Sequence, residues 1–282
     1  MNAQILDGKR LAAEVRAQTR EKAAAFTGRT GTAPGLATVL VGDDPASHVY
    51  VASKRKMAAA AGIADFHHHL PGPAPEREIA AVLDDLAADP RVSGILLQLP
   101  LPAGKDSASL IERIPAGKDV DGLTTTSAGL LSRAAPGLRP CTPSGVIALL
   151  DAAGIDLPGK HVAVVGRSQL VGAPLAQMLL HRNATVTVAH SRTADLAAVT
   201  READIVVAAA GREGLITAKH VREGAVVVDV GIHRTPDGLA GDVQFDEVAA
   251  RASWITPVPG GVGPMTIAML LANTLQAAAG LG

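Results

Sequence analysis

The sequence has few of the features that mark secreted or membrane proteins. Cys141 is the single cysteine among 282 residues, so no disulfide framework forms within the chain, which fits a reducing compartment. The first residues, MNAQILDGKR, lack a basic segment followed by an apolar one and predict no secretory signal. Apolar runs such as 205–210 are much shorter than the roughly 20 residues that a membrane helix needs. We therefore expect a cytoplasmic protein.

The sequence also lacks an excess of charge of either sign. Lys and Arg number 26 and Asp and Glu 27, so the formal net charge is -1 and gives no electrostatic footprint for nucleic acid or an anionic membrane. Hydrophobic residues make up 48% and charged residues 19%, which is enough to bury a core. The length allows two domains of ordinary size or one large α/β domain.

Strand-like apolar runs alternate with helical patterns in the first half of the chain. Strands are expected at 36–42 and 92–100, with a weaker one at 64–70, and helices at 45–62 and 75–89. This alternation predicts a parallel sheet that is covered on both faces.

The second half repeats the alternation after a stretch, 115–141, that is rich in Gly, Pro and Thr and has no clear period. We place the domain junction in that stretch. Thr142 is the expected N-cap of the helix that follows, with Pro143 at its first position. Further strands are expected at 161–166, 185–190, 204–211 and 224–231, with a helix ending near 182 and an apolar helix ending near 279.

A glycine-containing turn, GRSQLVGAP (166–174), follows the strand at 161–166 directly. A strand, a glycine turn and a helix start together form an anion site. Ser168 stands where the standard GxGxxG pattern has its second glycine, so an ordinary tight turn remains an alternative.

The next strand ends in His190-Ser191-Arg192-Thr193, where an NAD site would carry an acidic residue. A hydroxyl and a guanidinium instead suit the 2′-phosphate of NADP. The alternative for Arg192 is a solvated loop cation.

Tyr50 and Lys54 are four residues apart in a predicted helix and therefore share a face. A lysine near apolar residues can have a lowered pKa and carry protons, although an ordinary surface lysine is the alternative. Gln98 ends an apolar strand and needs a polar partner. Asp119 and Asp121, in GKDVDG, fit either a ligand site or simple turns.

Other residues that attract notice have structural explanations. Consecutive strand residues point to opposite faces, so His67, His68 and His69 do not form a metal cluster, and no Cys or acidic spacing completes one. We expect no metal. Cys141 fits a packed turn residue better than a nucleophile, and Trp254 fits the core.

Eight segments taken together resemble the bifunctional methylenetetrahydrofolate dehydrogenase/methenyltetrahydrofolate cyclohydrolase family, called FolD in bacteria. The segments occur in family order and read VGDDPASHVYVASKRKMAAAAGI, GILLQLPLP, KDVDG, RPCTPSGV, VVGRSQLVGAPLAQML, HSRT, GAVVVDVGI and TPVPGGVGPMT. The resemblance as a whole runs from about residue 4 to about residue 275. The resemblance implies oxidation of 5,10-methylenetetrahydrofolate by NADP and hydrolysis of the methenyl product to 10-formyltetrahydrofolate. It also implies a homodimer.

The resemblance implies an α/β fold with two domains. These are a folate-binding catalytic domain at 1–122 and a Rossmann-like NADP domain with a parallel sheet at 123–282, with a C-terminal helix near 264–282 that packs back on the first domain.

The resemblance also assigns residues. Lys54 is the catalytic lysine, Gln98 positions it, Tyr50 packs on the folate and Asp121 anchors the pterin. The remaining implied positions are Gly166, Arg167, Ser168, Ser191, Arg192 and Ile232 for NADP, and Pro259, Gly260 and Gly261 for the substrate.

One segment departs from the family pattern. After KDVDG the family commonly has a Pro and an Asn before the glycine, whereas 123–129 reads LTTTSAG, with Ser127 at or near the Asn position. Two alternatives therefore remain. One is a dehydrogenase that has lost most cyclohydrolase activity. The other is an NADP-binding regulatory protein with a degraded active site, against which Lys54, Gln98 and Asp121 argue.

Overall fold

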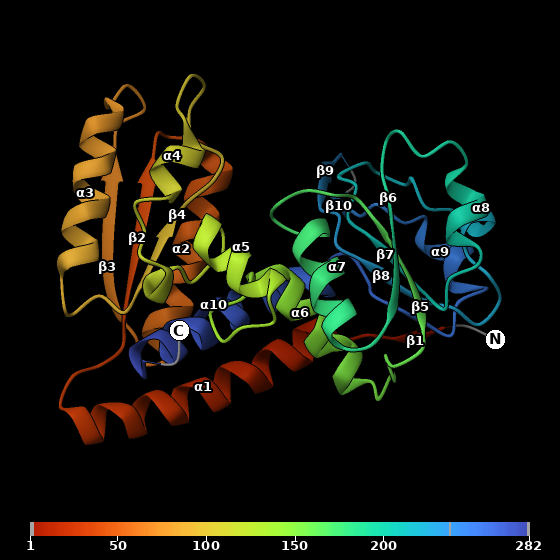
Figure 1. Ribbon diagram of the computed structural model, residues 1–282, viewed down its shortest axis with the longest axis horizontal. Coiled ribbons are helices and arrows are strands. Elements are labelled where there is room, and N and C mark those ends of the chain that lie inside the picture. Colours follow the sequence, from red (N-terminus) through yellow and green to blue (C-terminus); the bar gives the residue numbers. More distant parts are fainter. Residues whose placement is uncertain (1–2, 237, 281–282) are drawn as a thin grey trace. The chain divides into compact units, whose positions relative to one another are not determined.

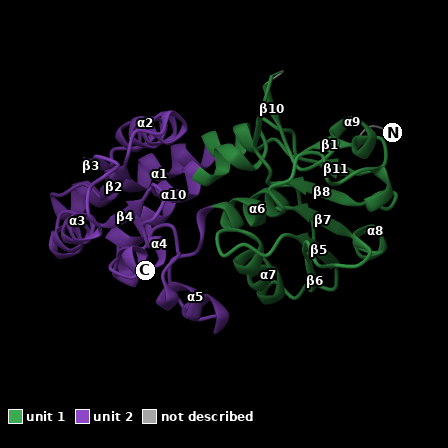
Figure 2. Cartoon of the chain, turned by 90° about the horizontal axis from the view of Figure 1, so that it is seen from above, with its two compact units in different colours: residues 1–13, 142–266 green, residues 14–141, 267–282 purple. Residues whose placement is uncertain are grey.

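The computed structural model describes residues 3–236 and 238–280, and these form two compact units (Figure 2). Unit 1 contains residues 1–13 and 142–266, and unit 2 contains residues 14–141 and 267–282. Helices α1 (Gly8–Thr30) and α10 (Val262–Ala278) each begin in unit 1 and end in unit 2. The functional division at 122/123 stays a prediction. No helix in the described part of the chain has the length and hydropathy that a bilayer span requires.

Unit 2 is built on a parallel sheet in the order β3 (Ala64–Leu70), β2 (Gly35–Val41), β4 (Gly94–Leu97). Its other helical segments are α2 (Pro45–Ala60), α3 (Glu76–Ala88), α4 (Ser107–Ile111), the 3-10 turn η1 (Ala116–Lys118) and α5 (Thr125–Ser132). The three strands and two helices predicted for the first half are confirmed.

The two faces of this sheet are buried against different helices (Figure 1). Alternate residues of β2 and β4, among them Val39 and Ile95, pack with Leu83 and other residues of α3 and α4. The intervening residues, such as Leu36 and Leu96, pack in a second cluster with residues of α2 and α10. The period of two along each strand therefore separates two apolar layers, as predicted for a sheet covered on both faces.

Unit 1 carries a second parallel sheet (Figure 1). The strand order is β1 (Gln4–Ile5), β11 (Trp254–Ile255), β8 (Val226–Asp229), β7 (Ile205–Ala208), β5 (His161–Val165), β6 (Thr185–Ala189). Its helices include α6 (Cys141–Ala152), α7 (Gly172–His181), α8 (Leu196–Thr200), the 3-10 turn η2 (Ala218–His220) and α9 (Phe245–Ala249), and β9 (His233–Thr235) pairs antiparallel with β10 (Gly238–Ala240).

The chain moves outward from β5 to β6 and then returns to β7 on the other side of β5. This reversal is a topological switch point, the place where open α/β sheets bind ligands at the carboxyl ends of their strands. The α/β fold class and the Rossmann-like second sheet are confirmed.

Three features differ from the expectations. Helix α6 begins at Cys141, so Thr142 is not an N-cap, and its hydroxyl is 2.9 Å from that of Thr266 instead. The junction stretch contains α5, whose N-cap Thr124 accepts a hydrogen bond from the backbone N–H of Ser127. Trp254 is only half-buried in the two-residue strand β11.

Candidate active and cofactor sites

Helix α2 brings Tyr50 and Lys54 together as the four-residue spacing predicts. Asp44 caps the helix by accepting a hydrogen bond from the backbone N–H of Ser47 at 2.8 Å, and Pro45 opens its first turn. The Lys54 Nζ lies 4.4 Å from the centroid of the Tyr50 ring, within cation–π distance. Lys54 is only 4% exposed, so the alternative of an ordinary surface lysine is wrong.

Gln98 holds the lysine from the neighbouring strand end. It follows β4 directly and is 8% exposed. Its side-chain oxygen accepts a hydrogen bond from Lys54 Nζ at 3.1 Å, and its amide nitrogen donates to the backbone oxygen of Leu99 at 2.6 Å. Both polar ends of the buried amide are therefore satisfied, and the predicted partner of Gln98 is the lysine.

Asp119 and Asp121 have different environments. The carboxylate of Asp119 is buried and accepts hydrogen bonds from the backbone N–H groups of Leu123 at 3.1 Å and Thr124 at 2.8 Å. Asp119 is therefore a turn residue, as its alternative interpretation predicts. Asp121 is half-buried and interacts electrostatically with Lys54 and Cys141.

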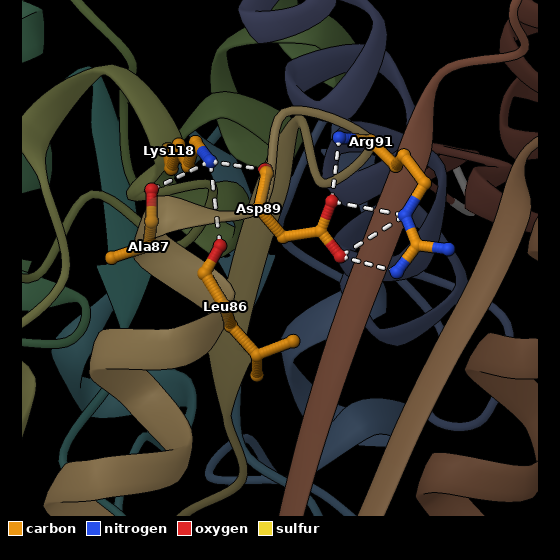
Figure 3. A network of polar contacts seen from close by, with 5 residues as sticks. All are labelled: Leu86, Ala87, Asp89, Arg91 and Lys118. Atoms are coloured by element: carbon orange, nitrogen blue, oxygen red, sulfur yellow. Dashed lines mark hydrogen bonds and ion pairs between the residues drawn. The ribbon is translucent and has the colours of Figure 1, made fainter.

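Lys118 fixes the start of the segment that carries both aspartates (Figure 3). Its ammonium donates to the backbone oxygens of Leu86 at 3.3 Å, Ala87 at 2.8 Å and Asp89 at 2.8 Å, and so closes the C-terminus of α3. The Asp89 carboxylate is itself held by the guanidinium of Arg91. The lysine of KDVDG thus serves packing and brings the aspartates to the end of β4.

Burial and the charges of neighbouring groups shift the pKa values of Lys54 and Asp121 in opposite directions. Burial lowers the pKa of the Lys54 ammonium, and the Asp121 carboxylate works against that shift. Burial raises the pKa of Asp121, and the positive charge of Lys54 lowers it in part. Burial and then the charge of Asp121 raise the pKa of the Tyr50 phenol, which stays protonated. The arrangement can therefore hold a lysine that exchanges a proton more readily than a solvated one.

Cys141 is buried at the start of α6, where its thiol donates to the backbone oxygen of Val120 at 3.2 Å. Burial and the charge of Asp121 raise the pKa of this thiol well above its usual value, so the thiolate is disfavoured. The prediction of a packed residue rather than a nucleophile agrees with this environment. Asn273 of α10 donates to the same Val120 oxygen at 2.8 Å.

The glycine turn of unit 1 forms a close-packed cradle after β5. Gly166 has φ +127°, and a Cβ there would lie 2.0 Å from the backbone oxygen of Ala209. A Cβ on Gly172 would lie 2.1 Å from the backbone oxygen of Gly166. Val171 forms no side-chain capping hydrogen bond to α7. The residues present therefore fit a phosphate group held by backbone N–H groups at the start of that helix.

The second loop of the predicted nucleotide site starts beside the first, because the Gly166 N–H donates to the Ala189 oxygen at 2.8 Å. The His190 N–H donates to the Thr193 hydroxyl at 2.9 Å, which closes a tight turn. Ser191 and Arg192 are left exposed at its tip. Both side chains are therefore accessible to a ligand that lies across the ends of β5 and β6.

The remaining predicted residues also lie in unit 1. Arg167 and Ser168 are exposed in the glycine turn, and Ile232, between the β8 end and β9, is 58% exposed. The backbone oxygen of Gly260 accepts from the Lys9 N–H at 2.8 Å, so the 259–261 loop is tied to the start of α1. The structure therefore gathers Tyr50, Lys54, Gln98 and Asp121 in unit 2, and Gly166, Arg167, Ser168, Ser191, Arg192, Ile232, Pro259, Gly260 and Gly261 in unit 1.

Two buried carboxylates that brace the carboxyl edge of unit 1 were missed. Asp242 accepts from the backbone N–H groups of Ala210 at 2.6 Å and Gly211 at 2.9 Å and pairs with His233 at 2.7 Å. Asp229 accepts from three backbone N–H groups, including that of Gly231 at 2.9 Å. The signal for Asp229 was available, because it ends the apolar run VVVD.

Two domain models of one protein family match most of the chain. Residues 6–121 match the model of the tetrahydrofolate dehydrogenase/cyclohydrolase catalytic domain, and residues 140–281 match that family's NAD(P)-binding domain. The chain belongs to the tetrahydrofolate dehydrogenase/cyclohydrolase family. Bifunctional protein FolD 2 of Frankia alni is 63% identical over 99% of this chain and 96% of the relative.

Solved structures of family members share the fold along the whole chain. The FolD methylenetetrahydrofolate dehydrogenase/cyclohydrolase of Campylobacter jejuni has a TM-score of 0.97 and 45% identity, covering 99% of each chain. The FolD enzyme of Trypanosoma brucei, complexed with NADP cofactor and inhibitor, has a TM-score of 0.95 and 38% identity, covering 99% of this chain and 98% of that one. The predicted family is confirmed.

Proposed function

We propose that this chain oxidises 5,10-methylenetetrahydrofolate with NADP and then hydrolyses the methenyl product to 10-formyltetrahydrofolate, as an enzyme of one-carbon metabolism. The observation that carries the proposal is the buried contact of Lys54 with Gln98 and Tyr50. Burying the amine of a lysine costs free energy. Ionisable groups with perturbed pKa values cluster at functional sites, so this burial supports a chemical role for Lys54.

In the first reaction the methylene carbon loses a hydride and becomes the methenyl cation. NADP, when bound, supplies the hydride acceptor. Tyr50 offers an aromatic face for the folate ring, and Asp121 offers a carboxylate for the pterin nitrogens and amino group. Pro259, Gly260 and Gly261 are assigned to substrate contact.

In the second reaction water adds to the methenyl carbon and loses a proton. The bond from that carbon to one ring nitrogen then breaks. The leaving nitrogen takes up a proton and the hydroxyl on the carbon gives one up, which leaves the formyl group on the other nitrogen and releases one proton overall. Lys54 is the group that carries the proton, because burial lowers its pKa. Gln98 acts through the lysine as a positioning residue, since its oxygen accepts from Nζ.

We assign NADP to the carboxyl edge of unit 1, with Gly166, Arg167 and Ser168 at the diphosphate side and Ser191 and Arg192 at the 2′-phosphate. Ile232 supplies apolar contact. The tight glycine cradle supports this assignment, because only a turn without Cβ atoms allows such close backbone approach.

A coupled absorbance assay tests the function. Methylenetetrahydrofolate with NADP should yield NADPH and a methenyl species that does not accumulate, and methenyltetrahydrofolate given alone should decay faster than in buffer. NADPH formation with lasting accumulation of the methenyl species would show a dehydrogenase without cyclohydrolase. NADP binding with neither activity would show a regulatory protein, and either result would overturn the proposal.

We further propose that the protein acts in the cytoplasm as a homodimer, as the family resemblance implies. Light scattering during gel filtration should give twice the 28.6 kDa mass of one chain. A mass of one chain at micromolar concentration would contradict the dimer.

A further inference from the structure

A second polar cluster lies in unit 2, outside the proposed active site. The Asp43 carboxylate oxygen is 3.3 Å from Nε2 of His69 and 3.6 Å from Nε2 of His48, and the two imidazole rings meet edge to face with centroids 5.0 Å apart. We propose that Asp43, His48 and His69 bind one divalent ion of the zinc type. This proposal does not depend on the proposed enzymatic function.

The three side chains come from ordered elements. Asp43 follows the β2 end, where the N–H of Gly42 donates to the Leu70 oxygen at 2.9 Å. His48 lies in the first turn of α2, which the Asp44 cap fixes. His69 lies near the end of β3, paired in register with Leu40. The backbone position of each ligand residue is therefore fixed before an ion binds, and only side-chain rotamers change on binding.

The alternation along β3 explains why one histidine of the HHH run takes part. Leu70 packs in the apolar cluster formed with α3 and α4, so His68 faces that same side of the sheet. His69 faces the other side, with His67, which bonds to the Thr38 hydroxyl at 2.9 Å. We expected no metal in this chain, because consecutive histidines point to opposite faces and no Cys or acidic spacing completes a site. The proposed cluster departs from that expectation, since two of its three ligands come from a different segment.

The distances fit tetrahedral coordination. Zinc lies about 2.0–2.2 Å from nitrogen and oxygen ligands, so two ligand atoms of one tetrahedron lie roughly 3.3–3.6 Å apart. The two distances from Asp43 are in this range, and all three ligand atoms lie within 4.8 Å of one another. A rotamer adjustment of the exposed side chains closes the remaining pair.

The donor set also indicates the class of ion. Two imidazoles and one carboxylate suit Zn²⁺, Co²⁺ or Ni²⁺ better than Mg²⁺ or Ca²⁺, which prefer oxygen ligands. Asp43 is 78% exposed, which leaves room for water at a fourth position. Nε2 of His69 lies 3.1 Å from the Gly42 oxygen and must be unprotonated to bind an ion, so its proton moves to Nδ1. The ion would link the start of α2 to the edge strand β3.

Zinc binding to the untagged full-length protein tests the site. Chelator-treated protein is titrated with ZnCl2 in a competition assay, and its melting temperature is measured with and without zinc. One ion per chain and a raised melting temperature are expected. His48→Ala and His69→Ala should each weaken zinc binding by more than about tenfold. Replacing a residue that only hydrogen-bonds to a metal ligand already lowers metal affinity by about that factor, and these variants remove the ligand itself. Asp43→Asn should weaken it as well.

His68→Ala is the matched control, because it removes the adjacent exposed histidine and should leave zinc affinity unchanged. Co²⁺ in place of zinc should give visible bands of a nitrogen and oxygen site without the thiolate absorption that Cys141 would produce. The proposal is overturned if His68→Ala weakens zinc binding as much as His69→Ala does. Unchanged binding in Asp43→Asn, or a thiolate band, would overturn it equally.

Discussion

Lys54 lies among groups that act on its proton in opposite directions. Burial favours the neutral amine, whereas the Asp121 carboxylate and the Tyr50 ring favour the ammonium. Gln98 offers an acceptor oxygen and holds Nζ in place. The pKa of the lysine is thereby lowered from its ordinary value, which makes the amine a better proton carrier than a solvated lysine.

Replacing Lys54 by Met should separate the hydrolysis of methenyltetrahydrofolate from cofactor binding. The substitution keeps the length of the apolar stem and removes the only proton-carrying atom of the side chain. Hydrolysis of methenyltetrahydrofolate should fall to the background rate, while NADP affinity stays nearly unchanged. Stopped-flow absorbance and a cofactor titration measure the two effects. Wild-type hydrolysis by the variant would refute the role of Lys54, and Lys56→Met, at an exposed position of the same helix, is the control.

Asp121 should contribute to folate affinity through its charge. A hydrogen bond to a charged group is worth roughly 1.5–3 kcal/mol, so Asp121→Ala should weaken folate binding by about ten- to a hundredfold. Fluorescence titration with a folate analogue measures the affinity, and circular dichroism checks the fold. Equal folate affinity in a folded variant would show that Asp121 does not touch the pterin.

At the scale of elements, the proposed catalytic groups come from different kinds of segment. Helix α2 carries Lys54, whereas Gln98 follows the β4 end and Asp121 lies in the segment beside that strand. The 118–121 segment runs beside β4, as the bridge between Ile95 and Asp119 shows. Lys118 anchors one end of the segment on α3, and Asp119 anchors the other on the α5 start. The position of Asp121 is therefore fixed by the contacts of Lys118 and Asp119, to which we assign no chemical role.

Lys118→Met should destabilise the protein without changing the chemistry of the site. The variant keeps the aliphatic stem but leaves three backbone oxygens near the α3 end without their charged donor. The expected loss is about 1.5–3 kcal/mol in the free energy of unfolding, measured by urea denaturation. Lys56→Met, at an exposed lysine, should change the free energy little. Equal stability of the two variants would refute the anchoring role.

The 190–193 turn should decide between NADP and NAD. Ser191 and Arg192 are exposed at its tip, where one charge-assisted contact to a 2′-phosphate is worth roughly 1.5–3 kcal/mol and less when solvent screens it. Ser191→Ala with Arg192→Ala should weaken NADP binding by about one to two decades and leave NAD binding nearly unchanged. The wild-type preference should shrink as salt rises. Calorimetric titration of wild type and the double variant with NADP and with NAD measures the four affinities. An equal loss of NADP and NAD affinity in the variant would contradict the predicted contact to the 2′-phosphate.

At the scale of the whole molecule, each of the two units is built on a parallel sheet, and the residues proposed to bind ligands lie mostly near the carboxyl ends of the strands of their own sheet. Burial around these ends places ionisable groups where water cannot solvate them. Asp229, at the end of β8, has a pKa raised to about 6, because burial outweighs its hydrogen bonds from backbone N–H groups. The global stability of the protein therefore responds to pH through a residue of the scaffold.

The sign of this response follows from the direction of the shift. A carboxyl whose pKa is higher in the folded state contributes stability below its ordinary pKa of 3.8 and loses that contribution as pH rises through about 6. The stability of Asp229→Asn relative to wild type should therefore rise over that window by up to about 3 kcal/mol. Urea denaturation between pH 4 and 7 measures it, with Asp246→Asn, at an exposed carboxylate of α9, as control. A constant difference between variant and wild type would contradict the prediction.

The sequence by itself determined the alternation of strands and helices and the family, and it predicted the glycine turn that we propose for NADP, because these depend on local periodicity and short motifs. It left helix α1 unassigned, and also the strands β1 and β11, whose two residues each are too few to show a period. Only the tertiary structure decided which polar side chains meet and which of them are buried. The contact between Lys54 and Gln98 spans 44 residues, and the histidine at 69 meets its partners 21 or more residues away. Burial, which sets both the pKa of Lys54 and the roles of Asp229 and Asp242, is a property of packing that no local pattern encodes.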